Sequence, residues 1–128
     1  MSTESQAILN PTGLVHGHTE VRFLDDTIPV LTKVLGLDLL ERHDRDAVLK
    51  HPNTGWQLIV HEGGAEVKDK PERNHYGVRV ANNLEVDHAY QYLLANKETL
   101  GLSKVVKRKE RAGSYSMFFV EPGGNYWE

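Results

Sequence analysis

Two histidines open two stretches of the chain that carry the same residue pattern. His18 begins the stretch HTEVRFLDD, and His75 begins the stretch HYGVRVANN at an offset of 57 residues (75 − 18). The Val-Arg pair in the middle is identical in both, and the acidic pair at the end of the first is matched by two asparagines in the second. Neutral imidazole is a common ligand of divalent metals, so two histidines at equivalent repeat positions predict one shared metal site.

The repeat also supplies an oxygen ligand from each half. Gln57 and Glu128 both follow a tryptophan, at an offset of 71 residues (128 − 57), and both fall in the last strand expected in their half. If a pseudo-twofold axis relates the halves, these two positions and the two histidines converge on one spot. Two imidazoles and one carboxylate form an open facial triad that is typical of non-haem Fe²⁺, and Mn²⁺, Ni²⁺, Zn²⁺ and Co²⁺ can also use it. Gln57 would be a weak, neutral fourth ligand.

Other polar residues near these strands have two interpretations each. His61 lies four residues after Gln57, so a regular strand turns it to the same face, where it could serve as a catalytic acid or base. The alternative is a surface histidine at the end of a strand. His16 shares a face with His18 and is expected at the surface, whereas Arg22 and Arg79 either face solvent or pair the two halves.

Each half predicts a strand, a helix and then three further strands. Asp25, Asp26 and Thr27 are suitable N-caps for the first helix, and Asn82 and Asn83 are suitable N-caps for the second. A glycine ends each helix, Gly36 in the first half and Gly101 in the second. Alternating polar and apolar residues predict a strand over 14–23, and shorter strands after each glycine over 37–42, 47–50, 56–61, 103–110, 115–120 and 125–128.

These elements predict an α+β fold made of two tandem βαβββ modules, whose curled mixed sheets enclose a central metal site. Residues 1–13 are expected to form a flexible N-terminal segment, and residues 14–128 a single domain. Within it, module one covers 14–62, a polar linker covers 63–73 and module two covers 74–128.

Composition excludes several classes of function. The 128 residues suffice for one compact domain, and the net charge of −3 gives no reason to expect nucleic acid as a partner. The absence of cysteine rules out disulfides, thiolate nucleophiles and zinc–thiolate sites. No apolar run is long enough to span a membrane, and no secretory signal precedes the repeat, so we expect a cytoplasmic protein.

With these motifs the chain resembles the vicinal oxygen chelate superfamily, which groups glyoxalase I, extradiol dioxygenases, fosfomycin-resistance thiol transferases and bleomycin-resistance binding proteins. The resemblance covers nearly everything from Leu14 onward and is carried by GHT at 17–19, TKVLGL at 32–37, HYGVRV at 75–80 and FVEPGGNYWE at 119–128. It implies that His18, His75 and Glu128 are metal ligands, with Gln57 at the fourth position that glyoxalase I fills with a ligand. It also implies a homodimer and a small substrate that binds the metal through two adjacent oxygens.

We therefore expect a metal-dependent enzyme and favour a non-haem Fe²⁺ dioxygenase, because three protein ligands leave room for both a catecholate and O₂. The chain departs from extradiol dioxygenases at Phe118 and Lys109, where those enzymes usually carry a tyrosine and a histidine.

Two alternatives are a glyoxalase-type lyase or isomerase, or a fosfomycin-resistance-like transferase, working with Mn²⁺, Ni²⁺ or Zn²⁺. In the glyoxalase-type reaction Glu128 would be the catalytic carboxylate. A third alternative is a metal-free small-molecule binding protein of the bleomycin-resistance type, although those proteins usually lack the three ligands. The modules can pair within one chain or be exchanged between two chains.

Overall fold

The computed structural model describes residues 7–107 and 113–128, and it contains two four-stranded mixed sheets, each with one helix. The first module contains β1 (His16–Val21), α1 (Leu24–Lys33), β2 (Asp38–Arg42), β3 (Asp46–Lys50) and β4 (Gln57–Glu62). The second contains β5 (His75–Tyr76), α2 (Asn83–Ala95), β6 (Lys104–Lys107), β7 (Met117–Val120) and β8 (Tyr126–Trp127). The strand orders β1-β4-β3-β2 and β5-β8-β7-β6 are the same in both sheets. The predicted α+β fold with a duplicated βαβββ pattern is therefore confirmed.

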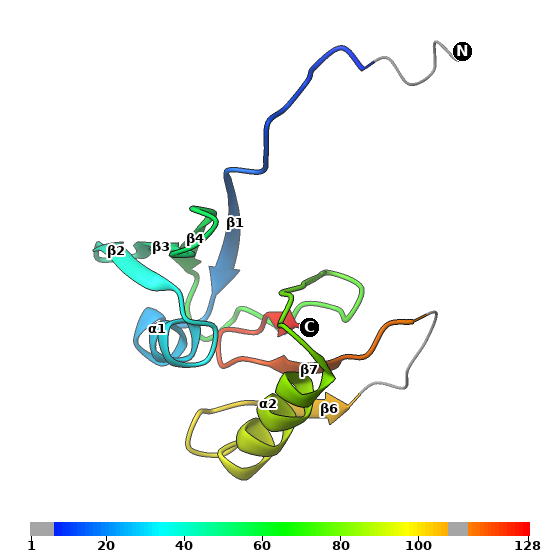
Figure 1. Ribbon diagram of the computed structural model, residues 1–128. Helices are drawn as coiled ribbons and strands as arrows, with labels where there is room; N and C mark the ends of the chain where they lie inside the picture. The colour runs from blue at the N-terminus through cyan, green and yellow to red at the C-terminus, as the bar shows by residue number, and fades with distance from the viewer. Residues whose placement is uncertain (1–6, 108–112) are drawn as a thin grey trace.

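The arrangement in space differs from the prediction in one respect. The two sheets are curled, but they do not close around a common centre (Figure 1). Residues 7–15 leave β1 as an extended, exposed segment, and the first six residues of the predicted N-terminal segment lie outside the described residues (Figure 1). The predicted strand 103–110 is described only as far as Lys107, where β6 ends, so Lys109 also lies outside the described residues. Neither helix among the described residues is long and apolar enough to cross a membrane.

The two helices begin in different ways. The prediction of a side-chain cap for α1 is wrong: the helix begins at Leu24 after Phe23, and Asp25 and Asp26 lie in its first turn, where negative charge favours the helix dipole. The cap of α2 is as predicted, since the Asn82 side chain accepts a hydrogen bond from the Glu85 amide at 3.0 Å. Gly36 and Gly101 follow the helices with positive φ angles of 69° and 70°, which permits the chain to turn.

Alternation along the strands separates a core face from an open face in the first sheet. Leu58 and Val60 of β4 are buried against the helix side, together with Ala47 and Leu49 of β3. His18 and His61 lie on the other face and are exposed, as is His16, which was expected at the surface. The period of two along a strand thus supplies the core with apolar residues while it presents imidazoles to the outside.

Arg22 joins the two modules, which is the second of the two roles considered for it. Its Nε donates to the Pro122 carbonyl at 3.0 Å and its Nη1 to the Val67 carbonyl at 2.8 Å. Its Nη2 pairs with the Asp69 carboxylate at 2.8 Å. One guanidinium, on the residue that follows β1, therefore links the first module to the connection between modules and to the turn that precedes β8.

The turn before β8 is built around a buried carboxyl group. The Glu121 side chain has no exposed surface and accepts hydrogen bonds from the amides of Gly123 and Asn125 at 3.0 and 2.8 Å. Burial raises the pKa of Glu121, and these hydrogen bonds oppose that effect. Because the carboxyl group ties the two ends of the turn together, it fixes the path on which the chain enters β8.

Gly123 of this turn packs directly on module one and gives the first prediction. A Cβ atom at this position would lie 2.6 Å from Val21 Cβ and 2.6 Å from Thr27 Oγ1. The substitution Gly123→Ala should therefore destabilise the protein by about 2 kcal/mol, as overpacking in a filled core does. Urea unfolding monitored by tryptophan fluorescence measures this change. Gly13→Ala is the matched control, because a Cβ there meets nothing within 4 Å; equal stability of the two variants would contradict the close packing.

Candidate metal centre

His75 and Glu128 form a pair of ligand-type side chains at the edge of the second sheet. His75 Nε2 lies 2.8 Å from Glu128 Oε1, and the two side chains are 29% and 24% exposed. The ring is also held through its other nitrogen, since Nδ1–H donates to the Glu72 carbonyl at 2.7 Å. The carboxylate is oriented too, because the Ser116 hydroxyl donates to Oε2 at 2.8 Å. An imidazole held through Nδ1 presents Nε2 outward, which is how metal-binding histidines are commonly oriented.

The separation of this pair suits two ligands of one ion. Donor atoms on neighbouring corners of an octahedron, each about 2.1 Å from a metal, lie about 3 Å apart. The distance of 2.8 Å between Nε2 and Oε1 is close to that value. In the absence of a metal, the same contact is an ion pair when His75 is protonated.

His18 and His61 form a second pair, on the open face of the first sheet. His18 Nδ1 lies 2.8 Å from His61 Nε2, and the ring planes are within 9° of parallel. His16 approaches His18 edge-on, with ring centroids 5.5 Å apart. Three imidazoles from β1 and β4 therefore gather on one surface.

Strand register relates the two pairs to each other. In the parallel pair β1–β4, His18 lies opposite Ile59, and His61 is two residues further along. In the parallel pair β5–β8, His75 lies opposite Tyr126, and Glu128 is two residues further along. His61 therefore occupies the position in module one that Glu128 occupies in module two.

Gln57 lies elsewhere on the same strand. It pairs with His16 at the start of β4, four residues before His61. The sequence repeat matched Gln57 to Glu128 through the tryptophans that precede them. By strand register, however, the residue of module one that corresponds to the buried Trp127 of module two is Val60. Aligning the two halves by their tryptophans therefore gives a different correspondence from the one that backbone pairing establishes.

The two pairs stay separate within one chain. The modules meet nearby, where the Thr19 hydroxyl donates to Asn125 Oδ1 at 2.8 Å and the Tyr76 hydroxyl lies 3.4 Å from the His18 carbonyl. Nevertheless, residues 7–107 and 113–128 contain no group of three or more His, Cys, Asp or Glu side chains that could hold a metal ion. The donor types fit a divalent metal, whereas the single chain supplies them as two half-sites.

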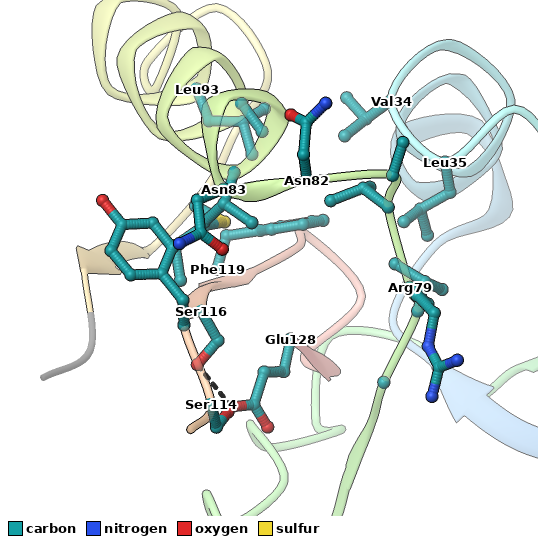
Figure 2. Close-up of a pocket in the computed structure, with 18 residues that line it drawn as sticks. Val34, Leu35, Arg79, Asn82, Asn83, Leu93, Ser114, Ser116, Phe119 and Glu128 are labelled. Carbon is teal, nitrogen blue, oxygen red and sulfur yellow. Dashed lines mark hydrogen bonds between the residues drawn. The ribbon is translucent and has the colours of Figure 1, made fainter. Parts of the chain in front are cut away.

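A cavity of about 540 Å³ adjoins Glu128. It lies between α2, the segment 77–83 and the end of α1, and its walls are largely apolar, with Val34, Leu35, Leu93 and Phe119 among them (Figure 2). Glu128 lies at one end with Ser114 and Ser116 (Figure 2). The sequence interpretation did not identify Ser116, since a serine beside a strand carries no signal until its neighbour across the sheet is known.

Tyr115 on the wall of this cavity is already engaged in a polar cluster. Its hydroxyl donates to Asp87 Oδ1 at 2.5 Å, and Lys107 Nζ lies 3.0 Å from the same oxygen. The hydrogen bond from Tyr115, and then Lys107, hold the pKa of Asp87 below its ordinary value. Asp87 therefore stays ionised and is a poor candidate for a general base, which leaves Glu128 as the carboxylate of interest here.

Comparison with models of known protein families identifies one superfamily. The model of the Glyoxalase/Bleomycin resistance protein/Dioxygenase superfamily matches residues 17–128. No curated protein matches the chain.

Solved structures share the fold at low sequence identity. A possible glyoxalase from Bacillus cereus is 24% identical with a TM-score of 0.72, covering 91% of this chain and 96% of the other. The fosfomycin resistance protein FosX from Listeria monocytogenes, as a glutamate-to-glutamine mutant with Mn(II) and 1S,2S-dihydroxypropylphosphonic acid, is 17% identical with a TM-score of 0.71, covering 92% and 88%. Lactoylglutathione lyase from Agrobacterium tumefaciens is 17% identical with a TM-score of 0.69, covering 92% of each chain.

The His75–Glu128 pair leads to a prediction for metal binding. His75→Ala should weaken binding of a divalent metal by more than about 100-fold, since residues that merely orient a ligand already contribute about 10- to 100-fold. Stability should change by less than about 1 kcal/mol, because the side chain is partly exposed at a strand edge. Titration calorimetry with Zn²⁺ and thermal unfolding measure the two quantities.

His43→Ala serves as the control, since His43 is 59% exposed, lies between β2 and β3 and pairs through its ring with Glu41 at 3.2 Å rather than with either candidate pair. Unchanged metal affinity in His75→Ala, or an equal loss in the control, would remove His75 from the metal site.

Proposed function

Because the chain belongs to the Glyoxalase/Bleomycin resistance protein/Dioxygenase superfamily, we propose that it is a metal-dependent enzyme whose small substrate binds the metal through two adjacent oxygen atoms. The observation that carries this proposal is the His75–Glu128 pair, with Nε2 and Oε1 2.8 Å apart and both side chains held by hydrogen bonds from behind. A bound divalent metal would supply Lewis-acid polarisation of the two substrate oxygens.

The chain's own residues divide the remaining work. His18 and His75, together with Glu128, are proposed to hold the metal. Glu128 also borders the cavity of about 540 Å³, so it is the carboxylate placed to accept a proton from a substrate carbon beside a polarised carbonyl. The apolar walls of the cavity suit the non-polar part of a small substrate and would exclude water from it.

Redox-neutral chemistry, as in a lyase, isomerase or transferase, is favoured by His61. This imidazole occupies the register position in module one that Glu128 occupies in module two. It would therefore offer the metal a fourth protein ligand, where an oxygenase needs a vacant position. A non-haem Fe²⁺ dioxygenase is the second candidate, favoured by the two histidines and one carboxylate of the proposed site. The dioxygenase candidate is weakened at Phe118, where extradiol dioxygenases usually carry a tyrosine. Phe118 packs against Tyr126 with ring centroids 5.8 Å apart and offers no hydroxyl for acid catalysis.

The experiment is metal analysis of anaerobically purified protein, followed by reconstitution of the metal-free protein with Fe²⁺, Mn²⁺, Ni²⁺ or Zn²⁺. Each form is then assayed for hemithioacetal isomerisation, thiol addition to epoxides and oxygen uptake with catechols. Turnover without oxygen uptake, with a metal other than iron, is the expected result. Oxygen uptake that requires Fe²⁺ would establish the second candidate. Failure to bind any divalent metal would overturn both and favour a metal-free binding protein.

A second copy of the chain is proposed to complete the metal site. Each chain carries both half-sites but does not join them within its described residues. A twofold dimer would bring the His18 side of one copy to the His75–Glu128 pair of the other, twice per dimer. Leu39 and Leu40 of β2, 42% and 48% exposed, supply apolar surface on the first module for such a contact.

Mixing two inactive variants tests this arrangement. One variant carries His18→Ala and the other carries Glu128→Ala, and neither should bind metal tightly alone. After the two are unfolded and refolded together in equal amounts, half of the dimers are mixed and each has one intact site, so metal content should recover to about a quarter of the wild-type value. No recovery, in a mixture shown to contain mixed dimers, would mean that each site is built within one chain.

A further inference from the structure

A second cavity, of about 320 Å³, lies at the seam between the two modules, and we call it the seam pocket. Thr19 of β1 and Asn125 of the turn before β8 line it, and its other lining residues all come from the segment 70–76. The Thr19 hydroxyl donates to Asn125 Oδ1 at 2.8 Å, so the pocket lies where the modules meet. Among the described residues, none lines both this pocket and the larger cavity beside Glu128.

The charged side chains that line the seam pocket are cationic. Lys70 and Arg73 line it next to His75, whereas no Asp or Glu side chain of the described residues does so. The whole chain, in contrast, has 18 acidic residues and 15 Lys and Arg residues. A recess lined by one sign of charge concentrates ions of the opposite sign, so this pocket attracts anions although the protein as a whole is acidic.

Lys70 is held at the pocket without a carboxylate partner. Its backbone amide donates to the Gly124 carbonyl at 2.8 Å, and its ammonium group donates to the Glu20 carbonyl at 2.8 Å. The carboxylate of the neighbouring Asp69 is paired with Arg22 instead. The half-buried ammonium therefore keeps two N–H donors and a charge that only a neutral oxygen of the described residues contacts. An anion in the pocket would compensate that charge.

Arg73 and Asn74 supply donors that the protein itself does not use. Within the described part of the chain, neither side chain makes a hydrogen bond or an ion pair, although both line the pocket. A guanidinium presents five N–H donors in a planar fork that matches the oxygens of phosphate and carboxylate groups. Two cations and one side-chain amide thus offer unused donors to the same small volume.

We propose that the seam pocket binds an oxyanion, that is, a phosphate, phosphonate or carboxylate group, through Lys70, Arg73 and Asn74. This site goes beyond the proposed metal-dependent function, since none of these three side chains is a candidate metal ligand. The volume of about 320 Å³ is at the lower end of the range of ligand pockets and suits a small anionic group.

The position of the pocket relates it to the candidate metal centre. His75 lines the seam pocket and Glu128 lines the larger cavity, and Nε2 of the first lies 2.8 Å from Oε1 of the second. The two cavities therefore adjoin at this pair. The oxyanion can be a group on the substrate, with the apolar part of the same molecule in the larger cavity, or it can be free phosphate. The first of these sources rests on the proposed function, whereas the pocket itself does not.

Titration of the full-length, metal-free protein with inorganic phosphate at constant ionic strength, followed by the NMR signals of the backbone amides, tests the site. We expect saturable shifts at residues 70–76 of the wild type. Arg73→Gln and Lys70→Gln should each weaken phosphate binding by about 10-fold or more, because each removes a charge-assisted hydrogen bond. Lys68→Gln is the matched control and should bind as the wild type does. It removes one charge from the same connection, at an exposed residue that does not line the pocket.

Two results would overturn the proposal. One is the absence of saturable shifts at residues 70–76 in the wild type, and the other is equal phosphate affinity in Arg73→Gln and in the Lys68→Gln control. Lys70→Arg guards against an indirect effect through the contact with Glu20, since it keeps both the charge and a donor. Phosphate should bind Lys70→Arg more tightly than Lys70→Gln, and equal affinities would contradict a direct contact from Lys70 to the anion.

A pair of chelating probes then distinguishes the two sources of the oxyanion. Glycerate and 3-phosphoglycerate share one hydroxy-acid unit, and only the second carries a phosphate group. If the pocket takes a group of the substrate, the metal-loaded protein should bind 3-phosphoglycerate more tightly than glycerate by about 10-fold or more, and Arg73→Gln should abolish the difference. If the pocket takes free phosphate, the two probes should bind equally and glycerate should bind together with inorganic phosphate. Phosphate-dependent shifts in a protein that binds no divalent metal would support the seam pocket and contradict the proposed function.

Discussion

The parallel pairing of the first and last strand in each module is the constraint on which the candidate site depends. Register in a sheet determines which side chains are neighbours, and a slip of one residue would turn a whole strand to the other face. Pairing of His18 with Ile59, and of His75 with Tyr126, brings His61 and Glu128 to their partners. The same pairing sends Val60 and Trp127 into the core. Core packing and ligand placement are therefore two consequences of one set of backbone hydrogen bonds.

Contacts between the modules fix the pairing of β5 with β8. The Arg22 guanidinium bonds to Pro122 and Asp69, and Gly123 packs on Val21 with no space for a side chain. The buried carboxyl group of Glu121 closes the turn, at the energetic cost that raises its pKa. The path of the chain into β8 is thereby set by residues of both modules. Glu128 is placed by this turn rather than by the strand alone, since β8 comprises only Tyr126–Trp127.

Much of the fold could be predicted from the sequence because both halves of the chain carry the same residue pattern. Two histidines at equivalent positions, helix-ending Gly36 and Gly101, and the Asn82 cap are all local signals that the structure reproduces. The residue of the first module that corresponds to Glu128 was harder to predict. Gln57 follows a tryptophan as Glu128 does, and residue similarity does not reveal which backbone atoms will pair across a sheet. Tertiary contacts also set the start of the first helix. It begins at Leu24, ahead of the capping residues expected from the sequence. Leu24 is buried in the core, and its amide donates to the Glu62 carboxylate of β4 at 2.9 Å. The open arrangement of the two sheets could not be predicted either, since strand alternation describes each sheet by itself and contains no information on how two sheets are oriented relative to one another.

The central claim is that one metal ion is held jointly by side chains of both modules. Anomalous diffraction at the absorption edge of the bound metal, from crystals of the metal-loaded protein, tests it most directly. We expect a single strong peak per chain, within bonding distance of His18 from one copy of the first module and of His75 and Glu128 from one copy of the second. A peak bound only by the His75–Glu128 pair, with no histidine of the first module near it, would contradict a metal site shared between the modules.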